Sequence, residues 1–459
     1  MLFQRIAYAL FPAVLLATLA AFVPPTIPAQ ETPTVRTPPP QQIEPPGEAP
    51  ATTARTETER YTLSHDRYEK AVAYSRAGYT LYFLSVFIGF AVLLLALRLG
   101  IVARIRDFAQ RTAENRFLQG LLFIPLLALL IDIADLPVHI AWHGLSLHYK
   151  QSVQRWGSWI LDWSKAELMN LAFLTLMGLI LFLVIRKSPR LWWFYFWLAA
   201  LPIMLGIFVL EPVIIDPLFH KFEPLAVHYP QLTTDLQKLT QRAGLQIPRD
   251  RMFLMDASTK TNQINAYVTG FGASKRVVIY DNMILKMTPQ ESLFIFGHES
   301  GHYVLNHLRN GFIYFAALLL ISLYIAYRLM NAILARWGPR WRVYGPQDWA
   351  ALAVLFFILQ GIMFVSSPVV NGYSRVQEHA ADVFGLELIH GIVPNSAEVA
   401  AHGFQAMGEI DLADPNPPAF ITFWMYSHPP LADRLVFAHT YDPWGKNQPP
   451  KYVKPEGNK

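Results

Sequence analysis

The chain has 459 residues, of which 53% are hydrophobic and 14% aromatic, while only 15% are charged. Its mean hydropathy of +0.26 is too high for an ordinary soluble protein of this length, so the composition indicates a membrane protein. The net charge of +5 is spread over short loops without a nucleic-acid motif, which argues against nucleic acid as a partner. The absence of cysteine excludes disulfides, a thiol nucleophile and cysteine-ligated zinc.

The N-terminal residues carry two features that do not indicate a folded domain. Residues 1–24 combine Arg5 with an apolar run, and small residues follow near Ala29, which is the pattern of a signal peptide or of a first membrane helix. Residues 25–60 are rich in Pro, Thr, Glu and Gln and lack the apolar content to fold. We expect them to form a flexible linker without chemistry of its own.

Six further segments are apolar and long enough to span a bilayer, several of them with Trp or Tyr at an end. They lie at about 79–97, 117–136, 167–185, 191–210, 311–330 and 349–370. We therefore expect membrane helices within 61–217 and a helical hairpin at 311–370. Residues 218–310 and 371–459 are water-compatible, so they would form one domain that the hairpin splits.

Three short strand-like runs lie in the first water-compatible region. Residues 252–255 form the first run, and residues 266–268 and 277–280 are β-rich and separated by a Gly-containing turn. The last two runs predict a β-hairpin that leads into a helix. A Thr-Pro-Gln-Glu sequence at 288–291 predicts the start of that helix, with an N-cap, a proline at N1 and a capping-box Glu.

The predicted helix carries the most specific motif of the chain, His-Glu-Ser-Gly-His at 298–302. On a helix, His298 and His302 would stack on one face, one turn apart, where they can share a Zn²⁺ ion. Glu299 would then point toward a metal-bound water and take its proton, which is the arrangement of a metallopeptidase. Three fixed residues can arise by chance in a chain with 14 His, so the motif needs support from its context.

A zinc site with two histidines needs a third protein ligand and an open position for water. Glu378 and Asp382 follow the last apolar segment and are four residues apart on a helical pattern, so they share a face. One of them can bind the metal while the other accepts a hydrogen bond from a ligand histidine. We rank Glu378 first as the third ligand, ahead of His307 and His379; a solvated acidic face is the alternative interpretation.

Several sequence blocks, in the same order, resemble the type 1 family of integral-membrane CAAX prenyl proteases. The resemblance covers most of the chain from about Tyr61 onward. The matching blocks are Asp216-Pro217-Leu218-Phe219 with Lys221-Phe222, Asn265-Ala266-Tyr267, Lys275 to Asp281, His298 to His302, Ser374-Arg375 with Glu378, Ala381-Asp382, and Ser427 to Leu435. Tyr303 stands where the family often has Trp, Asp433 replaces a usual Glu, and the Pro-rich linker is a further departure.

The resemblance implies a mostly α-helical fold, with six to seven membrane helices around a water-filled chamber and a split zincin-like domain containing a small β-sheet. It also implies one Zn²⁺ per chain and a set of site residues. These are His298, His302 and Glu378 as zinc ligands, Glu299 as general base and proton donor, and Asp382 as support for a ligand histidine.

Two further parts of the site follow from the same resemblance. His428 would donate to the oxyanion of the tetrahedral intermediate, with Arg434 nearby. Asn265, Ala266 and Tyr267 would form the edge strand on which an extended peptide is laid out, because main-chain hydrogen bonds make little demand on sequence.

Positive charge is concentrated in alternate loops between the apolar segments, and such loops tend to stay cytoplasmic. These loops carry Arg98, Arg104, Arg106, Arg111, Arg186, Lys187, Arg190, Arg328, Arg336, Arg340 and Arg342, whereas the opposite side carries Arg67, Lys70, Arg76, Lys150, Arg155 and Lys165. We therefore expect the catalytic domain to face away from the cytoplasm. Eukaryotic relatives are understood to present it to the cytosol, so the resemblance favours the opposite orientation.

Asp132, Asp135 and His139 lie at i, i+3 and i+7 near the end of an apolar segment and so share one helical face. Because ionisable groups inside a membrane usually face a cavity or a partner, we hypothesise that this face lines the chamber. The alternative is that the segment has already left the hydrocarbon at this point.

The sequence thus predicts a multi-pass, membrane-integral zinc metalloendopeptidase that contacts membrane lipid and cleaves a peptide or protein substrate. Whether that substrate is lipidated, and whether the chain forms an oligomer, is left open. One alternative is a quality-control protease that degrades damaged membrane proteins without a prenyl group. The other is a transporter or channel in which the zinc motif is coincidental.

Overall fold

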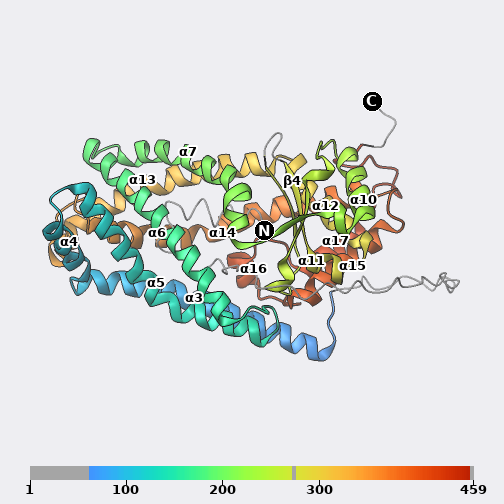
Figure 1. The fold of residues 1–459 in the computed structure, drawn as a ribbon, viewed down its shortest axis with the longest axis horizontal. Coiled ribbons are helices and arrows are strands. Elements are labelled where there is room, and N and C mark those ends of the chain that lie inside the picture. The colour runs from blue at the N-terminus through green and yellow to red at the C-terminus, as the bar shows by residue number, and fades with distance from the viewer. Residues whose placement is uncertain (1–60, 271–274, 455–459) are drawn as a thin grey trace.

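The structure is a computed structural model that describes residues 61–270 and 275–454. The expected signal or first helix and the expected linker lie outside the described residues. The molecule is elongated, with a bundle of long helices on the left of Figure 1 and a domain of shorter helices and strands on the right. We call the second part the mixed domain; among the described residues it comprises 220–270, 275–304 and about 371–454.

Within the described ranges, six helical segments are long and apolar enough to cross a membrane. They are α3 (His65–Arg98), α5 (Arg116–His148), α6 (Trp156–Lys187), the continuous run Trp192–Phe219, α13 (His307–Trp341) and α14 (Ala351–Ile389). The run Trp192–Phe219 comprises α7 (Trp192–Leu210), the π-helical turn η2 (Glu211–Ile215) and α8 (Asp216–Phe219). Each expected apolar segment overlaps one of these six, which confirms the predicted helical membrane fold.

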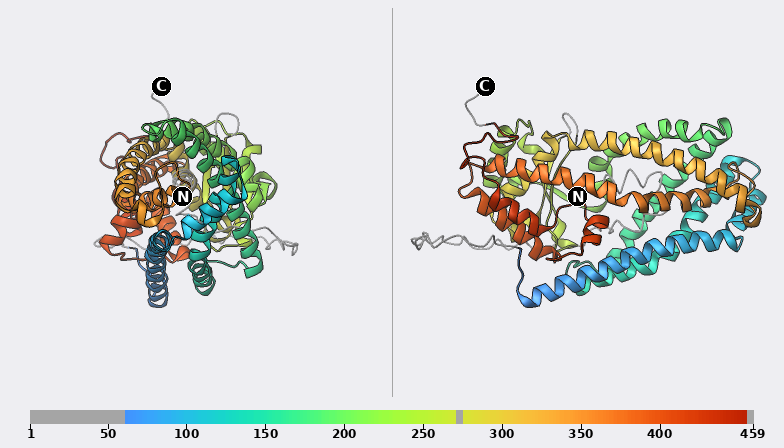
Figure 2. Two further views of the ribbon diagram at one scale, coloured as in Figure 1. Left: turned by 90° about the vertical axis from the view of Figure 1, so that its left-hand side faces the viewer. Right: turned by 180° about the vertical axis from the view of Figure 1, so that it is seen from behind.

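Several helices extend well beyond the apolar windows that predicted them. The expected domain boundaries at 310/311 and 370/371 fall inside α13 and α14, and α14 runs from the bundle into the mixed domain (Figure 2). Hydropathy marks where a helix stops being compatible with lipid, not where its hydrogen bonds end. A short amphipathic helix, α4 (Ile101–Thr112), joins α3 to α5 at the far end of the bundle.

The mixed domain contains a four-stranded sheet with the strand order β1-β2-β4-β3. Its strands are β1 (Phe222–Pro224), β2 (Met252–Met255), β3 (Ala266–Thr269) and β4 (Arg276–Tyr280). Strands β3 and β4 pair antiparallel, which confirms the predicted hairpin, while β2 and β4 pair parallel. Strand β3 is therefore an edge strand, as the resemblance implied.

Short helices surround this sheet. Before α13 the mixed domain contains α9 (Leu225–His228), α10 (Pro230–Arg242), the 3₁₀ turns η3 (Arg249–Arg251) and η4 (Ala257–Thr259), α11 (Asp281–Lys286) and α12 (Pro289–Val304). After α14 it contains α15 (Ser396–Asp411), α16 (Ala419–Met425) and α17 (Leu431–Thr440). The two halves share one hydrophobic core, in which the Phe294 ring of α12 meets the Phe404 ring of α15 edge-on, with centroids 5.0 Å apart.

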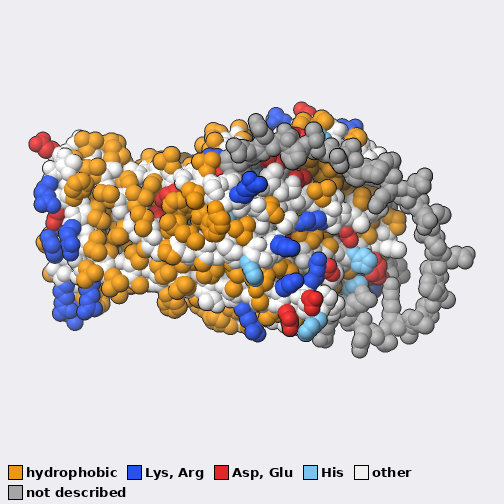
Figure 3. Space-filling view, turned by 60° about the horizontal axis from the view of Figure 1, so that its bottom comes forward, with side chains coloured by type: hydrophobic (Ala, Val, Ile, Leu, Met, Phe, Trp, Pro, Cys, Tyr) orange, Lys and Arg blue, Asp and Glu red, His pale blue; other side chains and the backbone are white. Residues whose placement is uncertain are grey.

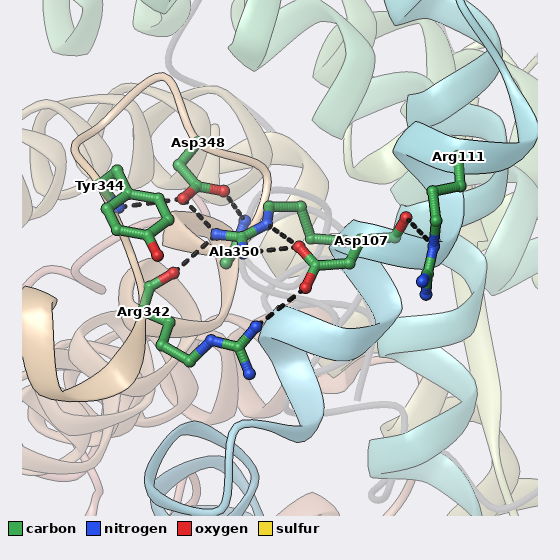
Figure 4. A network of polar contacts seen from close by, with 7 residues as sticks. Asp107, Arg111, Arg342, Tyr344, Asp348 and Ala350 are labelled. Atoms are coloured by element: carbon green, nitrogen blue, oxygen red, sulfur yellow. Dashed lines mark hydrogen bonds and ion pairs between the residues drawn. The ribbon is translucent and has the colours of Figure 1, made fainter.

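A polar network ties the helices together at the end of the bundle that is remote from the mixed domain (Figure 4). The buried Arg106 of α4 donates to Asp348 Oδ2 (2.7 Å) and to the carbonyl oxygen of Arg342 (2.6 Å), both in the loop between α13 and α14. Its remaining nitrogens donate to Asp107, which also accepts from Arg342. Because breaking a buried ion pair leaves a charge uncompensated, this network fixes the loop against α4.

The ionisable residues predicted on one face of α5 connect helices inside the bundle. Asp132 lies close enough to Glu167 of α6 for their charges to interact. Asp135 accepts from Ser85 Oγ of α3 at 2.9 Å and lies 3.6 Å from His139 Nε2. These contacts give the acids partners across three helices; that this face lines a water-filled chamber stays a hypothesis.

Helices α12 and α14 cross at very close range, and small residues permit this approach. A Cβ atom on Gly385 would lie 2.7 Å from the backbone nitrogen of His298, and one on Gly297 would lie 3.1 Å from the carbonyl oxygen of Gly385. A Cβ atom on Gly301 would lie 3.2 Å from the Cα of Ala381. Two glycines four residues apart on α12, and an alanine and a glycine four residues apart on α14, thus let the two backbones touch. This contact joins the halves of the split domain.

We predict that Gly385→Ala destabilises the protein, because its new Cβ would meet backbone atoms that cannot rotate away. Overpacking of this kind costs about 1–3 kcal/mol, so the melting temperature of the protein in detergent should fall. Gly206→Ala on α7 is the matched control, since nothing lies within 4 Å of its added Cβ. An unchanged melting temperature for Gly385→Ala would show that the crossing is looser than the structure indicates.

Candidate metal centre

The two histidines of the motif lie on α12, whose start follows the predicted signals. The Thr288 side chain accepts from the Glu291 backbone and the Glu291 side chain accepts from the Thr288 backbone, so the capping box is confirmed. The helix continues through the motif and brings the Nε2 atoms of His298 and His302 to within 3.1 Å of each other. Both rings therefore present the same nitrogen to one point.

Glu378 of α14 faces that point from the other side of the crossing. Its Oε2 lies 3.2 Å from His298 Nε2 and its Oε1 lies 3.6 Å from His302 Nε2. One atom from each of these side chains lies within 4.8 Å of the other two, a spacing that could hold a metal ion. The described residues contain this one group of histidine and carboxylate side chains with such a spacing.

Side chains outside the three-residue group hold the His298 ring through its other nitrogen, Nδ1. His298 Nδ1 donates to Asp382 Oδ1 at 2.8 Å, and Asp382 accepts from Arg434 Nε and Nη2 of α17 at 2.9 and 2.5 Å. Burial alone would lower the pKa of His298, but hydrogen bonds to Asp382 and Glu378 raise it to about 9. The carboxylates that favour an imidazolium here would also favour a metal cation placed between them.

His428 lies beside the third member of the group. Its Nε2 is 3.2 Å from Glu378 Oε2, and its Nδ1 is 2.9 Å from the hydroxyl of Ser427. Burial lowers the pKa of His428, which keeps the ring neutral at neutral pH. When Nε2 of a neutral imidazole faces a carboxylate, Nε2 carries the proton. Nδ1 of His428 is therefore unprotonated and accepts a hydrogen bond from the Ser427 hydroxyl.

The other residues with expected roles lie around this group. Glu299 is half-buried beside His298 on α12, and its charge acts on Arg434. Asn265 immediately precedes β3, in which Ala266 and Tyr267 are buried and pair with Ile279 and Val278 of β4. Strand β3 also packs against α12, so the edge strand and the histidine motif are neighbours.

A partly buried ion pair fixes the β3–β4 hairpin to the end of the bundle. Asp216 Oδ2 accepts from Arg276 Nη2 and from the Tyr267 hydroxyl, each at 2.9 Å. Asp216 and Arg276 belong to two separate sequence blocks that resemble the CAAX prenyl protease family. Their ion pair gives a structural reason for the presence of each of these two residues.

The two competing ligand candidates do not join the three-residue group. His379 is exposed, and its ring meets Phe437 edge-on with centroids 5.0 Å apart. His307 Nδ1 lies 3.0 Å from His302 Nδ1, which is the ring nitrogen of His302 that does not face Glu378. From the sequence, His307 was considered only as a ligand and Ser427 was given no role. The available signals were that His307 follows His302 by five residues and that Ser427 directly precedes His428.

Comparison with known protein families assigns both halves of the chain. Residues 228–441 match peptidase family M48, and residues 51–221 match the CAAX prenyl protease N-terminal family, described as five membrane helices. The first match includes the histidine motif, Glu378 and His428, and the second includes most of the membrane bundle.

Individual relatives agree with this assignment. The uncharacterized metalloprotease YhfN of Bacillus subtilis is 32% identical over 372 residues, which cover 81% of this chain and 85% of the relative. A CAAX prenyl protease 1 homolog of Dictyostelium discoideum is 30% identical over 57% of this chain and 58% of its own. The crystal structure of S. mikatae Ste24p has a similar fold, with a TM-score of 0.70 and 22% identity over 83% of this chain and 90% of that chain. The chain therefore belongs to peptidase family M48 and is a membrane-embedded metalloprotease.

Proposed function

We propose that His298, His302 and Glu378 bind one Zn²⁺ ion and that the chain is a zinc endopeptidase. The observation that carries this proposal is the convergence of two imidazole nitrogens and a carboxylate from two different helices on one point. Glu378 Oε2 is buried and faces only the Nε2 atoms of His298 and His428, each at 3.2 Å, so a cation at this point would compensate its charge. Two histidines and a glutamate with one further position open form a ligand set of catalytic zinc.

Glu299 is the general base of the proposed reaction. When bound, the ion supplies Lewis acidity, polarising the scissile carbonyl and lowering the pKa of a nearby water molecule. Glu299 follows a ligand histidine directly on α12, so its carboxylate can reach that water, remove a proton and pass it to the leaving amine. Its partial exposure leaves it open to both water and substrate.

His428 is the donor that stabilises the developing oxyanion. Its ring is neutral with the proton on Nε2, and this nitrogen lies 3.2 Å from Glu378, at the edge of the proposed metal site. Ser427 orients the ring through its contact with Nδ1. A donor that is already in place where negative charge develops needs no reorganisation during the reaction.

Asp382 and Arg434 act as positioning residues. Asp382 holds His298 by Nδ1, which leaves Nε2 of His298 unprotonated for the metal, and Arg434 compensates the buried carboxylate with two hydrogen bonds. Because Arg434 is engaged by Asp382 in this way, its effect on the reaction passes through His298.

The substrate is a peptide or protein segment in an extended conformation. Strand β3 at the edge of the sheet would pair with it, with Asn265, Ala266 and Tyr267 contributing main-chain groups. Several relatives are named as CAAX prenyl proteases, which supports a lipidated C-terminal peptide as the substrate class. The family assignment does not favour the transporter or the quality-control alternative.

The mixed domain faces away from the cytoplasm in our proposed topology. The arginine-rich loops α3–α4–α5, α6–α7 and α13–α14 all lie at the end of the bundle opposite the mixed domain, and Lys and Arg side chains gather at that end in Figure 3. Hydrophobic side chains dominate the surface between the two ends. Since positive loops stay cytoplasmic, this arrangement supports an outward-facing active site.

We expect Glu299→Gln to lower kcat by about 10²–10⁴-fold, because the amide cannot take a proton from water. The fold and the bound zinc should stay unchanged. Cleavage of a prenylated peptide and of its unlipidated counterpart by purified protein measures the first effect, and elemental analysis measures the second. Glu291→Gln is the matched control on the same helix, since a capping box accepts either side chain. Full activity of Glu299→Gln would exclude Glu299 as the base.

His428→Ala should lower kcat by about 10²–10³-fold, as expected for the loss of one oxyanion donor. Zinc content should not change, which separates this role from that of a ligand. Ser427→Ala should have the same kind of effect at a smaller size, because the ring is retained but less well oriented. His379→Ala, one residue from Glu378, should behave as the wild type. A loss of zinc in His428→Ala would point to a ligand in place of a donor.

A reporter that functions only in the cytoplasm should be inactive when fused after Lys459 and active when inserted at Ser188 between α6 and α7. A second reporter that functions only outside the cytoplasm should give the opposite pattern. Both results follow from the side on which the arginine-rich loops are retained. Cytoplasmic activity of the Lys459 fusion would reverse the proposed orientation.

A further inference from the structure

His307 lies at the turn that joins α12 to α13 and has no role in the proposed reaction described above for Glu299 and His428. Helix α12 ends at Val304, Asn306 has a left-handed φ of 58°, and His307 begins α13. This reversal turns the His307 ring onto that of His302, with centroids 5.0 Å apart and planes at 75°. His307 is only 5% exposed, so water competes weakly for its ring nitrogens.

The contact between the two rings defines where their protons lie. The Nδ1 atoms of His302 and His307 are 3.0 Å apart, and a hydrogen bond between them needs one N–H group and one lone pair. His302 Nε2 faces His298 Nε2 and Glu378, so binding a metal there leaves the proton of the His302 ring on Nδ1. His302 therefore donates to His307, whose own proton must then lie on Nε2.

His307 contacts the side of the His302 ring that faces away from Glu378. It is therefore not a fourth member of the metal group. The two nitrogens of an imidazole point to different sides of the ring, and His307 meets the nitrogen that does not face Glu378. Asp382 stands in the same relation to His298. The Nδ1 atom of His298 is thus hydrogen bonded to a carboxylate, whereas the Nδ1 atom of His302 is hydrogen bonded to a neutral imidazole. The neutral ring adds no second buried charge that would need its own compensation.

Building on the proposed zinc site, we propose that His307 is a positioning residue for His302. By accepting the Nδ1–H of His302, His307 Nδ1 holds that ring in one orientation and keeps its Nε2 unprotonated and directed at the ion. The effect of His307 is on metal affinity, and it acts through His302 without contact to the ion.

Zinc affinity tests this proposal without any measurement of activity. Titration of the metal-free, full-length protein against a fluorescent zinc chelator should show binding about 10–100-fold weaker in His307→Leu than in the wild type. His307→Asn should stay within a few-fold of the wild type, because its amide oxygen can accept at the place of Nδ1. His307→Phe keeps the ring volume without an acceptor, so it should resemble the leucine variant. His379→Leu serves as the control and should bind normally.

Two results would overturn the proposal: wild-type zinc affinity in both His307→Leu and His307→Phe, or an asparagine variant as weak as these two. The melting temperature of each metal-free variant is measured alongside, so that lost packing is separated from lost metal affinity. A wild-type protein that binds no zinc would overturn the proposed function itself. That result is distinct from tight binding in the wild type and the variants alike, which would remove only the role of His307.

Discussion

Helices α12 and α14 approach so closely at Gly297 and Gly385 that a single methyl group would separate them. The rest of the candidate site depends on this contact. His298 and His302 come from one helix and Glu378 and Asp382 from the other, and none of these side chains is long enough to bridge a wider crossing. Because α14 is also a membrane-spanning helix, the same rigid element holds the third donor and anchors the mixed domain to the bundle.

Burial of charge is the second constraint on this site. Asp382 and Glu378 are both buried, and each needs a partner in a region from which water is excluded. Arg434 compensates Asp382 with two hydrogen bonds, whereas Glu378 faces only histidine rings. A bound cation would complete the charge balance around Glu378, so metal binding and the stability of the mixed domain should be coupled.

Much of this arrangement could be predicted from local sequence patterns. The capping box and the four-residue spacing of the histidines predicted the helix and its ligand face, and the apolar segments predicted the six long helices. Glu378 was ranked above His307 and His379, and the structure places it with the histidine pair. Helix ends were predicted poorly, because hydropathy reports contact with lipid and α14 continues into the mixed domain as a regular helix.

By itself, the sequence determined which segments enter the membrane, where the motif helix begins and which side chains share a helical face. These properties follow from spacing along the covalent chain and from local capping, so they need no knowledge of distant contacts. Only the tertiary structure decided that Glu378 joins the histidines, that Asp382 pairs with Arg434, and that His307 turns back onto His302. Those choices depend on how closely two helices cross and on the left-handed turn at Asn306, which set distances between side chains that the order of residues leaves free.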